Sequence, residues 1–225
     1  MTAARRIFLI HATRIAIEPI NAAFVQGWPE AQRFDLWDDS LSKDASSAGG
    51  STPALDQRIQ DLAEHAFRAQ ADAVLFTCSA FSNAIEACQR RHQRPVLKPN
   101  EAMVQEALAS GGRIAALTTF DPAGAAIVND FEVEASRRGQ AVDITAILCE
   151  GALEALHAGD QARHDALIAA AAGRLRGDYD VLCFAQFSMT AAQSASEAAW
   201  GGSVLTTPAS AVRRLRQLLD GSERR

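Results

Sequence analysis

Thr77, Cys78 and Ser79 stand in a row at the end of a short apolar segment, and no other stretch of this sequence is better suited to chemistry. The preceding segment, 73–76, is long enough for a buried strand and too short for a buried helix. The residues from 80 to 91 favour a helix. The sequence therefore predicts a strand that ends at Thr77 and a helix that begins just after Cys78.

A thiol in that position is expected to act as an acid, a base or a nucleophile. The free N–H groups and the dipole of a helix N-terminus favour an anion, so they are expected to lower the pKa of Cys78 below its usual value of about 8.5. The hydroxyls of Thr77 and Ser79 flank the thiol as donors. The competing interpretation is that Cys78 is a small buried hydrophobic residue, since free cysteines are often buried.

The composition excludes several classes of function. The net charge is −5, so there is no basic excess to hold nucleic acid. No apolar run approaches the roughly 18 residues of a membrane span, and the run 7–10 is too short for a signal peptide. The cysteines form no C-x-x-C pair, which argues against a zinc site; they are Cys78, Cys88, Cys149 and Cys183. The length of the chain also argues against a disulfide framework, which suggests a reducing compartment. We therefore expect a cytoplasmic protein without nucleic-acid or membrane partners.

Strand and helix signals alternate from end to end, which predicts an α/β fold with mostly parallel sheets. The expected strands are 7–10, 34–37, 73–77, 96–97, 113–117, 142–148, 180–184 and 204–205. The expected helices are 14–26, 55–70, 80–91, 100–109, 122–138, 151–157, 160–175, 188–199 and 208–219. The segment 40–52 is rich in Ser, Asp, Ala and Gly and is expected to be a flexible loop, in which Gly49 and Gly50 could form the hinge of a lid or a plain turn.

The sequence also contains an internal repeat. Arg113 follows Arg6 by 107 residues, and Asp180 follows Asp72 by 108, each within a matching segment. The repeat predicts two similar parallel-sheet halves related by a pseudo-twofold axis, with domain 1–98 plus 208–225 and domain 99–207. Ligands in such sheets bind beyond the carboxyl ends of the strands, so the active site is expected in a cleft between the halves. The alternative is that any chain of βα units shows similar spacing.

Four segments carry a resemblance to a known group of proteins: FTCS at 76–79, ALTTF at 116–120, FAQFSM at 184–189 and TPASAV at 207–212. In these segments the chain resembles the aspartate/glutamate (hydantoin) racemase superfamily, which includes arylmalonate decarboxylase and maleate isomerase. The resemblance covers nearly the whole chain. It implies carbon-acid chemistry without a cofactor, in which two cysteines move a proton on and off the carbon next to a carboxylate.

The resemblance places Cys78 at the first cysteine position, but the second one is missing. By the internal offset that position is filled by Gln186, or by Ala185 if the placement slips by one residue, and neither can carry a proton. His11 ends the first strand and could serve as acid, base or carboxylate partner, or simply cap the strand. Cys78 is therefore the predicted catalytic residue, with no metal ligands, and the predicted substrate-binding residues are His11, Thr77, Ser79, Thr118, Thr119, Gln186 and Phe187.

The remaining cysteines and histidines are expected to be bystanders. Cys183 should point into the core, Cys149 should lie in the core rather than at the cleft rim, and Cys88 should lie near the surface on a helix. His164 should be solvated, as should the other helix and loop histidines.

The sequence thus favours a cofactor-independent carbon-acid enzyme that acts on a small carboxylate through a single cysteine. A racemase- or isomerase-like reaction is the first interpretation and decarboxylation the second. The competing hypothesis is a catalytically silent carboxylate-binding protein on the same fold. The sequence leaves the oligomeric state open, with a homo-oligomer among the alternatives.

Overall fold

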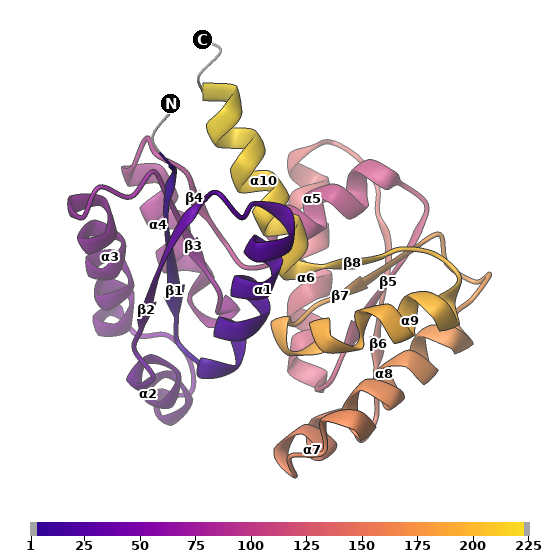
Figure 1. Cartoon of the computed structure of the whole chain (residues 1–225). Helices are drawn as coiled ribbons and strands as arrows, with labels where there is room; N and C mark the ends of the chain where they lie inside the picture. The colour runs from indigo at the N-terminus through magenta and orange to yellow at the C-terminus, as the bar shows by residue number, and fades with distance from the viewer. Residues whose placement is uncertain (1–3, 223–225) are drawn as a thin grey trace. The chain divides into compact units, whose positions relative to one another are not determined.

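Two parallel sheets of four strands each form the framework of the computed structural model, which describes residues 4–222 (Figure 1). The chain divides into two compact units. Within the described range, unit 1 comprises residues 4–99 and 211–222, and unit 2 comprises Asn100–Ser210. In the described residues no helix is long and apolar enough to cross a membrane.

Unit 1 carries the sheet β2-β1-β3-β4, in which all neighbouring strands are parallel. Its strands are β1 (Arg6–His11), β2 (Gln32–Trp37), β3 (Ala73–Phe76) and β4 (Val96–Leu97). Its helices are α1 (Ile17–Gly27), α2 (Ser40–Ala48), α3 (Pro53–Arg68) and α4 (Ser82–Arg91), with short 3-10 turns η1 (Arg14–Ala16) and η2 (Ser79–Phe81).

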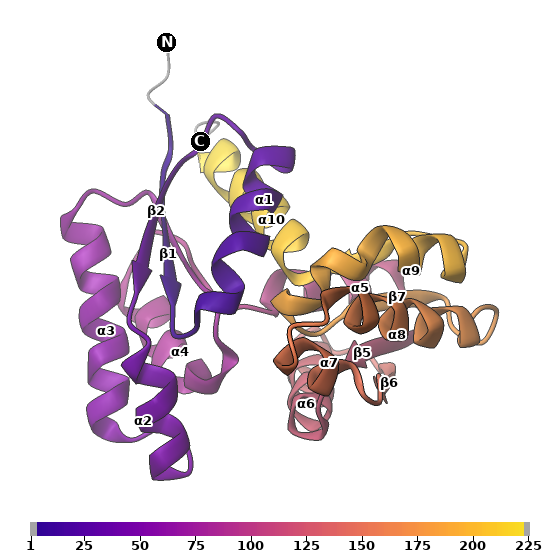
Figure 2. The same ribbon diagram turned by 60° about the horizontal axis from the view of Figure 1, so that its bottom comes forward.

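The two faces of the first sheet are covered by different helices. Phe8, Ile10, Val74 and Phe76 pack into a core cluster with buried residues of α2, α3 and α4. The alternating residues point to the opposite face, where α1 and the C-terminal helix α10 (Thr207–Ser222) lie side by side (Figure 2). Strand residues therefore alternate between an α3/α4 face and an α1/α10 face.

Unit 2 repeats this plan with the sheet β6-β5-β7-β8, again all parallel. Its strands are β5 (Arg113–Thr118), β6 (Asp143–Leu148), β7 (Val181–Phe184) and β8 (Val204–Thr206). Its helices are α5 (Glu101–Ser110), α6 (Asp121–Arg137), α7 (Ala152–His157), α8 (Gln161–Arg174) and α9 (Gln193–Trp200), with the 3-10 turn η3 (Phe187–Ala192). One core cluster joins the sheet to α8 and α9, and another joins it to α5 and α6.

Each unit contains equivalent hydrogen bonds as well as the same strand order, which confirms the predicted α/β fold with two similar halves. The backbone N–H of Arg6 donates to the carboxylate of Asp72 at 2.7 Å, and that of Arg113 donates to Asp180 at 2.8 Å. At the other end of the sheets, the N–H of Thr77 donates to the carbonyl of Ile10, as that of Ala185 does to Leu117, both at 3.0 Å. The internal repeat of the sequence therefore corresponds to equivalent positions in space within each unit.

The prediction of a flexible loop over 40–52 is wrong, because α2 occupies most of it. Leu41 and Ala45, four residues apart, bury on one side of the helix. Gly49 then ends the helix in the left-handed conformation, with φ of 73°. The sequence gives little sign of this helix, because most of its residues are small or polar and only two of the nine are buried.

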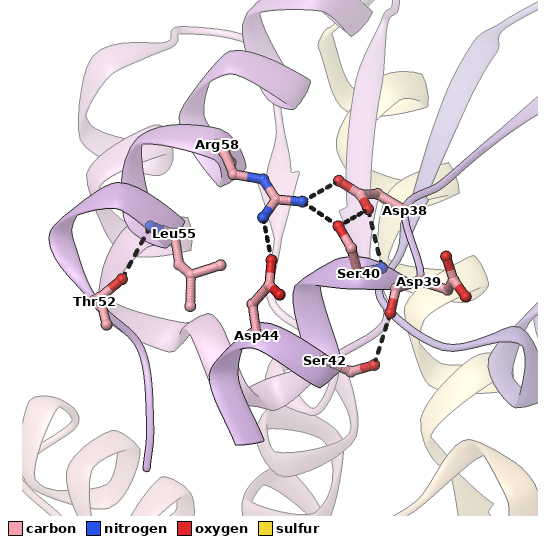
Figure 3. Close-up of polar contacts among 8 residues, drawn as sticks. All are labelled: Asp38, Asp39, Ser40, Ser42, Asp44, Thr52, Leu55 and Arg58. Atoms are coloured by element: carbon pink, nitrogen blue, oxygen red, sulfur yellow. Dashed lines mark hydrogen bonds and ion pairs between the residues drawn. The ribbon is translucent and has the colours of Figure 1, made fainter. Parts of the chain in front are cut away.

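Arg58 of α3 ties α2 to the end of β2 (Figure 3). Its guanidinium donates to Asp38 at 2.6 Å, to Asp44 at 2.7 Å and to the hydroxyl of Ser40 at 2.5 Å. Burial raises the pKa of Asp38, but hydrogen bonds from Ser40 and Arg58 outweigh it and hold that pKa below the ordinary value. This cluster attaches α2 to the rest of unit 1.

Arg58→Gln is expected to loosen α2 without unfolding unit 1. Losing these charged hydrogen bonds at a partly exposed site should cost about 1–2 kcal/mol of local stability. Backbone hydrogen exchange in α2 should then become about tenfold faster. Arg68→Gln, at an exposed position of the same helix, is the matched control. Equal exchange rates in the two variants would contradict the attachment role.

Candidate active site

Cys78 lies just beyond the carboxyl end of β3, a central strand of unit 1. Its backbone is extended, with φ −124° and ψ 125°, and it is the residue from which η2 begins. The side chain is partly buried and packs against the core cluster on the α3/α4 face of the sheet. The strand thus presents a thiol at the sheet edge where ligands of parallel α/β proteins bind.

The expected lowering of the Cys78 pKa is wrong in sign. Burial raises the pKa of this thiol above its ordinary value, and the backbone N–H of Ala80 offsets only part of the rise. The cause lies in the local structure: Cys78 precedes a three-residue 3-10 turn, and the α-helix α4 begins only at Ser82. Cys78 is therefore mainly a neutral thiol near pH 7, a form that donates a proton rather than accepting one.

His11 and Thr77 belong to a hydrogen-bonded network at the same sheet edge. The Nδ1 atom of His11 lies 2.9 Å from Thr77 Oγ1, and its Nε2 atom lies 2.9 Å from Asp35 Oδ1. Asn21 of α1 donates to both carboxylate oxygens of Asp35, at 3.1 and 3.3 Å. The His11 hydrogen bond lowers the pKa of Asp35, against the opposing effect of burial, and Asn21 adds to the lowering.

This network lies on the α1/α10 face, opposite to Cys78. Ile10 and Ala12 pack in the α3/α4 core, so His11, which lies between them, points to the other face of the sheet. Thr77 follows the last residue of β3 and lies between Phe76 and Cys78, which pack on the α3/α4 face, so it also points to the other face. His11 has no exposed surface and both of its ring nitrogens have partners. Its predicted contact with a substrate stays a prediction, and the geometry favours a positioning role. Ser79 is exposed, and its carbonyl accepts from the Ser82 hydroxyl.

In unit 2, Gln186 occupies the position that Cys78 holds in unit 1. It follows β7, has extended backbone angles of φ −139° and ψ 141°, and starts η3. Its Oε1 atom accepts from the backbone N–H of Thr119 at 2.7 Å and from the Thr119 hydroxyl at 3.0 Å. Because an N–H can only donate, the amide oxygen must face Thr119, which leaves the NH₂ group directed elsewhere as a donor.

The structure brings the predicted residues of unit 2 together at one sheet edge. Thr118 ends β5 and is buried, Thr119 holds Gln186, and Phe187 opens η3 with 6% of its surface exposed. Thr118 also lines a pocket of about 580 Å³ between α6 and β6. This edge offers amide and hydroxyl donors but no thiol at the position of Gln186.

Asp35 and Asn21 are not among the residues predicted from the sequence. Asp35 interrupts an apolar strand between Phe34 and Leu36, and an acidic residue there was the available signal. Asn21 carries no signal, because an Asn on an amphipathic helix normally faces solvent. The pairing of β1 with β2 places Asp35 beside His11, and Asn21 joins them through its hydrogen bonds to Asp35.

The other cysteines are core residues. Burial raises the pKa of Cys149 and of Cys183 to about 12, and that of Cys88 to about 11. The core positions expected for Cys149 and Cys183 are confirmed, but Cys88, expected near the surface, is buried because α4 turns it inward with Ala84 and Ile85. In residues 4–222, no group of three or more His, Cys, Asp or Glu side chains could hold a metal ion.

His164 was expected to be solvated and is fully buried. It lies one turn before the core residue Ile168 on α8, with Nδ1 2.8 Å from the carboxylate of Asp165. The buried face of α8 therefore begins at His164, one turn before the first buried hydrophobic residue of the helix.

Duplicated parallel α/β units with polar side chains at the carboxyl ends of their central strands define a known class of protein. Residues 10–215 match the model of the Asp/Glu/Hydantoin racemase family, and the chain belongs to this family. No curated protein sequence matches the chain.

Solved structures show the same fold. Allantoin racemase from Klebsiella pneumoniae is 14% identical, with a TM-score of 0.73, covering 97% of this chain and 89% of that one. An aspartate racemase homologue from Pyrococcus horikoshii is 12% identical, with a TM-score of 0.72 and coverage of 95% and 98%. A glycine-to-cysteine mutant of arylmalonate decarboxylase is 17% identical, with a TM-score of 0.62 and coverage of 93% and 92%. At these identities the likeness shows a shared fold.

Proposed function

We propose that the protein is a cofactor-independent enzyme of carbon-acid chemistry that acts on a small carboxylate through the thiol of Cys78. The observation that carries the proposal is the contrast between equivalent positions, a thiol in unit 1 and an oriented amide in unit 2. Membership of a racemase family supports the class of reaction.

Each group has a role that its chemistry allows. The neutral thiol of Cys78 delivers a proton to one face of a carbanion or enediolate next to the carboxylate. The NH₂ group of Gln186, fixed by Thr119, donates to a carboxylate or enolate oxygen. An amide cannot take up or release a proton near neutral pH, so the second half of a two-base racemisation has no evident carrier at this position.

Two reactions suit a single thiol: decarboxylation followed by protonation on one face, and isomerisation of a double bond by reversible thiolate addition. The raised pKa of Cys78 favours the first, since a proton donor must be protonated at working pH. The second candidate function is a carboxylate-binding protein without turnover. The amide of Gln186 favours it over a two-base racemase, because its oxygen is occupied by Thr119 and its NH₂ group can only donate a hydrogen bond.

A panel of small carboxylates in D₂O tests the proposal. It should contain disubstituted malonates, maleate, chiral amino acids and substituted hydantoins, followed by CO₂ release, deuterium uptake at carbon and optical rotation. We expect turnover of at least one substrate with deuterium placed on a single face. Binding by calorimetry without any turnover across the panel would instead establish the silent carboxylate-binding protein.

A further inference from the structure

The hydrogen-bonded network of unit 1 joins three neighbouring strands and a helix. Asn21 comes from α1, Asp35 from β2, His11 from the end of β1, and Thr77 from the position after β3. Each link is within 3.3 Å, and Thr77 is the residue directly before Cys78. The network thus runs from a carboxylate with 37% of its side chain exposed to the neighbour of the candidate catalytic thiol.

The fold itself does not require this network, as unit 2 shows. Asp35 pairs in register with Leu9, and its counterpart in unit 2 is Ala146, which pairs with Ala116. The end of β1, His11, corresponds to Thr118 at the end of β5.

Ala146 and Thr118 line the open pocket beside α6 instead of forming a polar chain. Gly124 of α6 also lines it and approaches both: a Cβ on this glycine would lie 3.4 Å from the Ala146 side chain and 3.9 Å from Thr118 Oγ1. Unit 2 keeps the same strand order and parallel pairing without the network. The network is therefore found in the unit that carries Cys78 and not in the unit that carries Gln186, although the two sheets have the same strand order.

The chemistry of the network fixes Thr77 in either charge state of His11. Asp35 is an acceptor, so His11 carries a hydrogen on Nε2. If His11 is an imidazolium, its Nδ1 donates to Thr77, whose hydroxyl then donates to the carbonyl of Ile10 at 3.3 Å. If His11 is neutral, the Thr77 hydroxyl donates to Nδ1 instead.

We propose that Asp35 and His11 are positioning residues for Cys78: through Thr77 they hold the end of β3 from the α1/α10 face, so that the thiol stays partly buried on the α3/α4 face. This inference rests on the proposed function for its catalytic meaning, but the positioning can be measured without a substrate. Releasing Thr77 should let the thiol move towards solvent, which makes it more reactive to an external reagent and less effective in catalysis.

The probe is iodoacetamide, with alkylation of Cys78 followed by mass spectrometry from pH 6 to 10. In Asp35→Ala the alkylation midpoint should fall by about one pH unit, which makes the reaction about tenfold faster at pH 7.5. Asn21→Ala removes only the outer link and should give about a threefold increase, so the inference stays testable if Asp35→Ala folds poorly. Asp165→Ala is the matched control, because it removes the carboxylate from a different buried histidine, His164.

An unchanged Cys78 profile in folded Asp35→Ala and Asn21→Ala would overturn the inference, as would an equal shift in Asp165→Ala. With a substrate from the carboxylate panel, kcat should fall about 10²-fold in Asp35→Ala with a smaller change in KM, as expected when a reacting group is misplaced. A shifted alkylation profile without turnover on any panel compound would retain the positioning role while rejecting the proposed enzyme.

Discussion

Cys78→Ala is expected to reduce turnover of any substrate found in the carboxylate panel to the background rate. General acid–base groups contribute about 10²–10⁴-fold, and Cys78→Ala removes the proton donor of the proposed reaction. His11 and Thr77 point to the opposite face and already have partners. Binding of the carboxylate should change little, because its donors lie elsewhere. The measurement is kcat together with the dissociation constant from calorimetry.

Cys88→Ala is the control for this prediction. Cys88 is buried in the α3/α4 core, so its replacement should cost about 1 kcal/mol of stability and leave turnover near wild type. The pH profile provides a second check. A proton-donating thiol must be neutral, so kcat should decline at alkaline pH as the thiolate forms, while alkylation of the same residue increases. Near wild-type turnover in Cys78→Ala would refute the catalytic assignment.

The architecture could be predicted from the sequence because it follows from local patterns and their repetition. The buried strands are short apolar runs. Asp72 and Asp180 are equivalent because each accepts a hydrogen bond from the backbone N–H of the residue that begins the first strand of its unit. The same offset placed Gln186 at the position equivalent to Cys78, where both residues have extended backbone and start a 3-10 turn.

The features that could not be predicted depend on contacts between segments far apart in the sequence. The pKa of Cys78 is raised because its partial burial outweighs the one backbone N–H that reaches it, and the sequence shows only the nearby helix. The partnership of His11 with Asp35 depends on the register of β1 against β2. The helix α2 is attached through Arg58, which stands at least ten residues further along the chain.

Gln186→Cys is expected to move the protein towards racemisation. Inverting a carbon needs one group to remove a proton and another to return one on the opposite face. Wild type supplies one thiol and, at the equivalent position, an amide. The new thiol would inherit the N–H and hydroxyl of Thr119, which now donate to the Gln186 oxygen and would stabilise a thiolate.

The expected result is about a 10²-fold gain in racemisation or in exchange of the α-proton, the contribution of one general acid–base group. A product that wild type makes as one enantiomer should become a mixture of both. Deuterium uptake and optical rotation for the same carboxylates provide the measurement. Gln186→Ala is the matched control, since it removes the amide without adding a thiol and should weaken binding without causing racemisation.

The double variant Cys78→Ala, Gln186→Cys separates a two-thiol mechanism from a simple change of binding. If both thiols are needed, the double variant should lose the racemase activity that Gln186→Cys gains. A wild-type protein that already inverts a substrate at about 10 s⁻¹, a typical enzyme rate, would show that a second base operates without a thiol at the position of Gln186. In that case the single-thiol mechanism would be wrong, and the Gln186 amide would be a binding group beside a proton carrier from elsewhere in the chain.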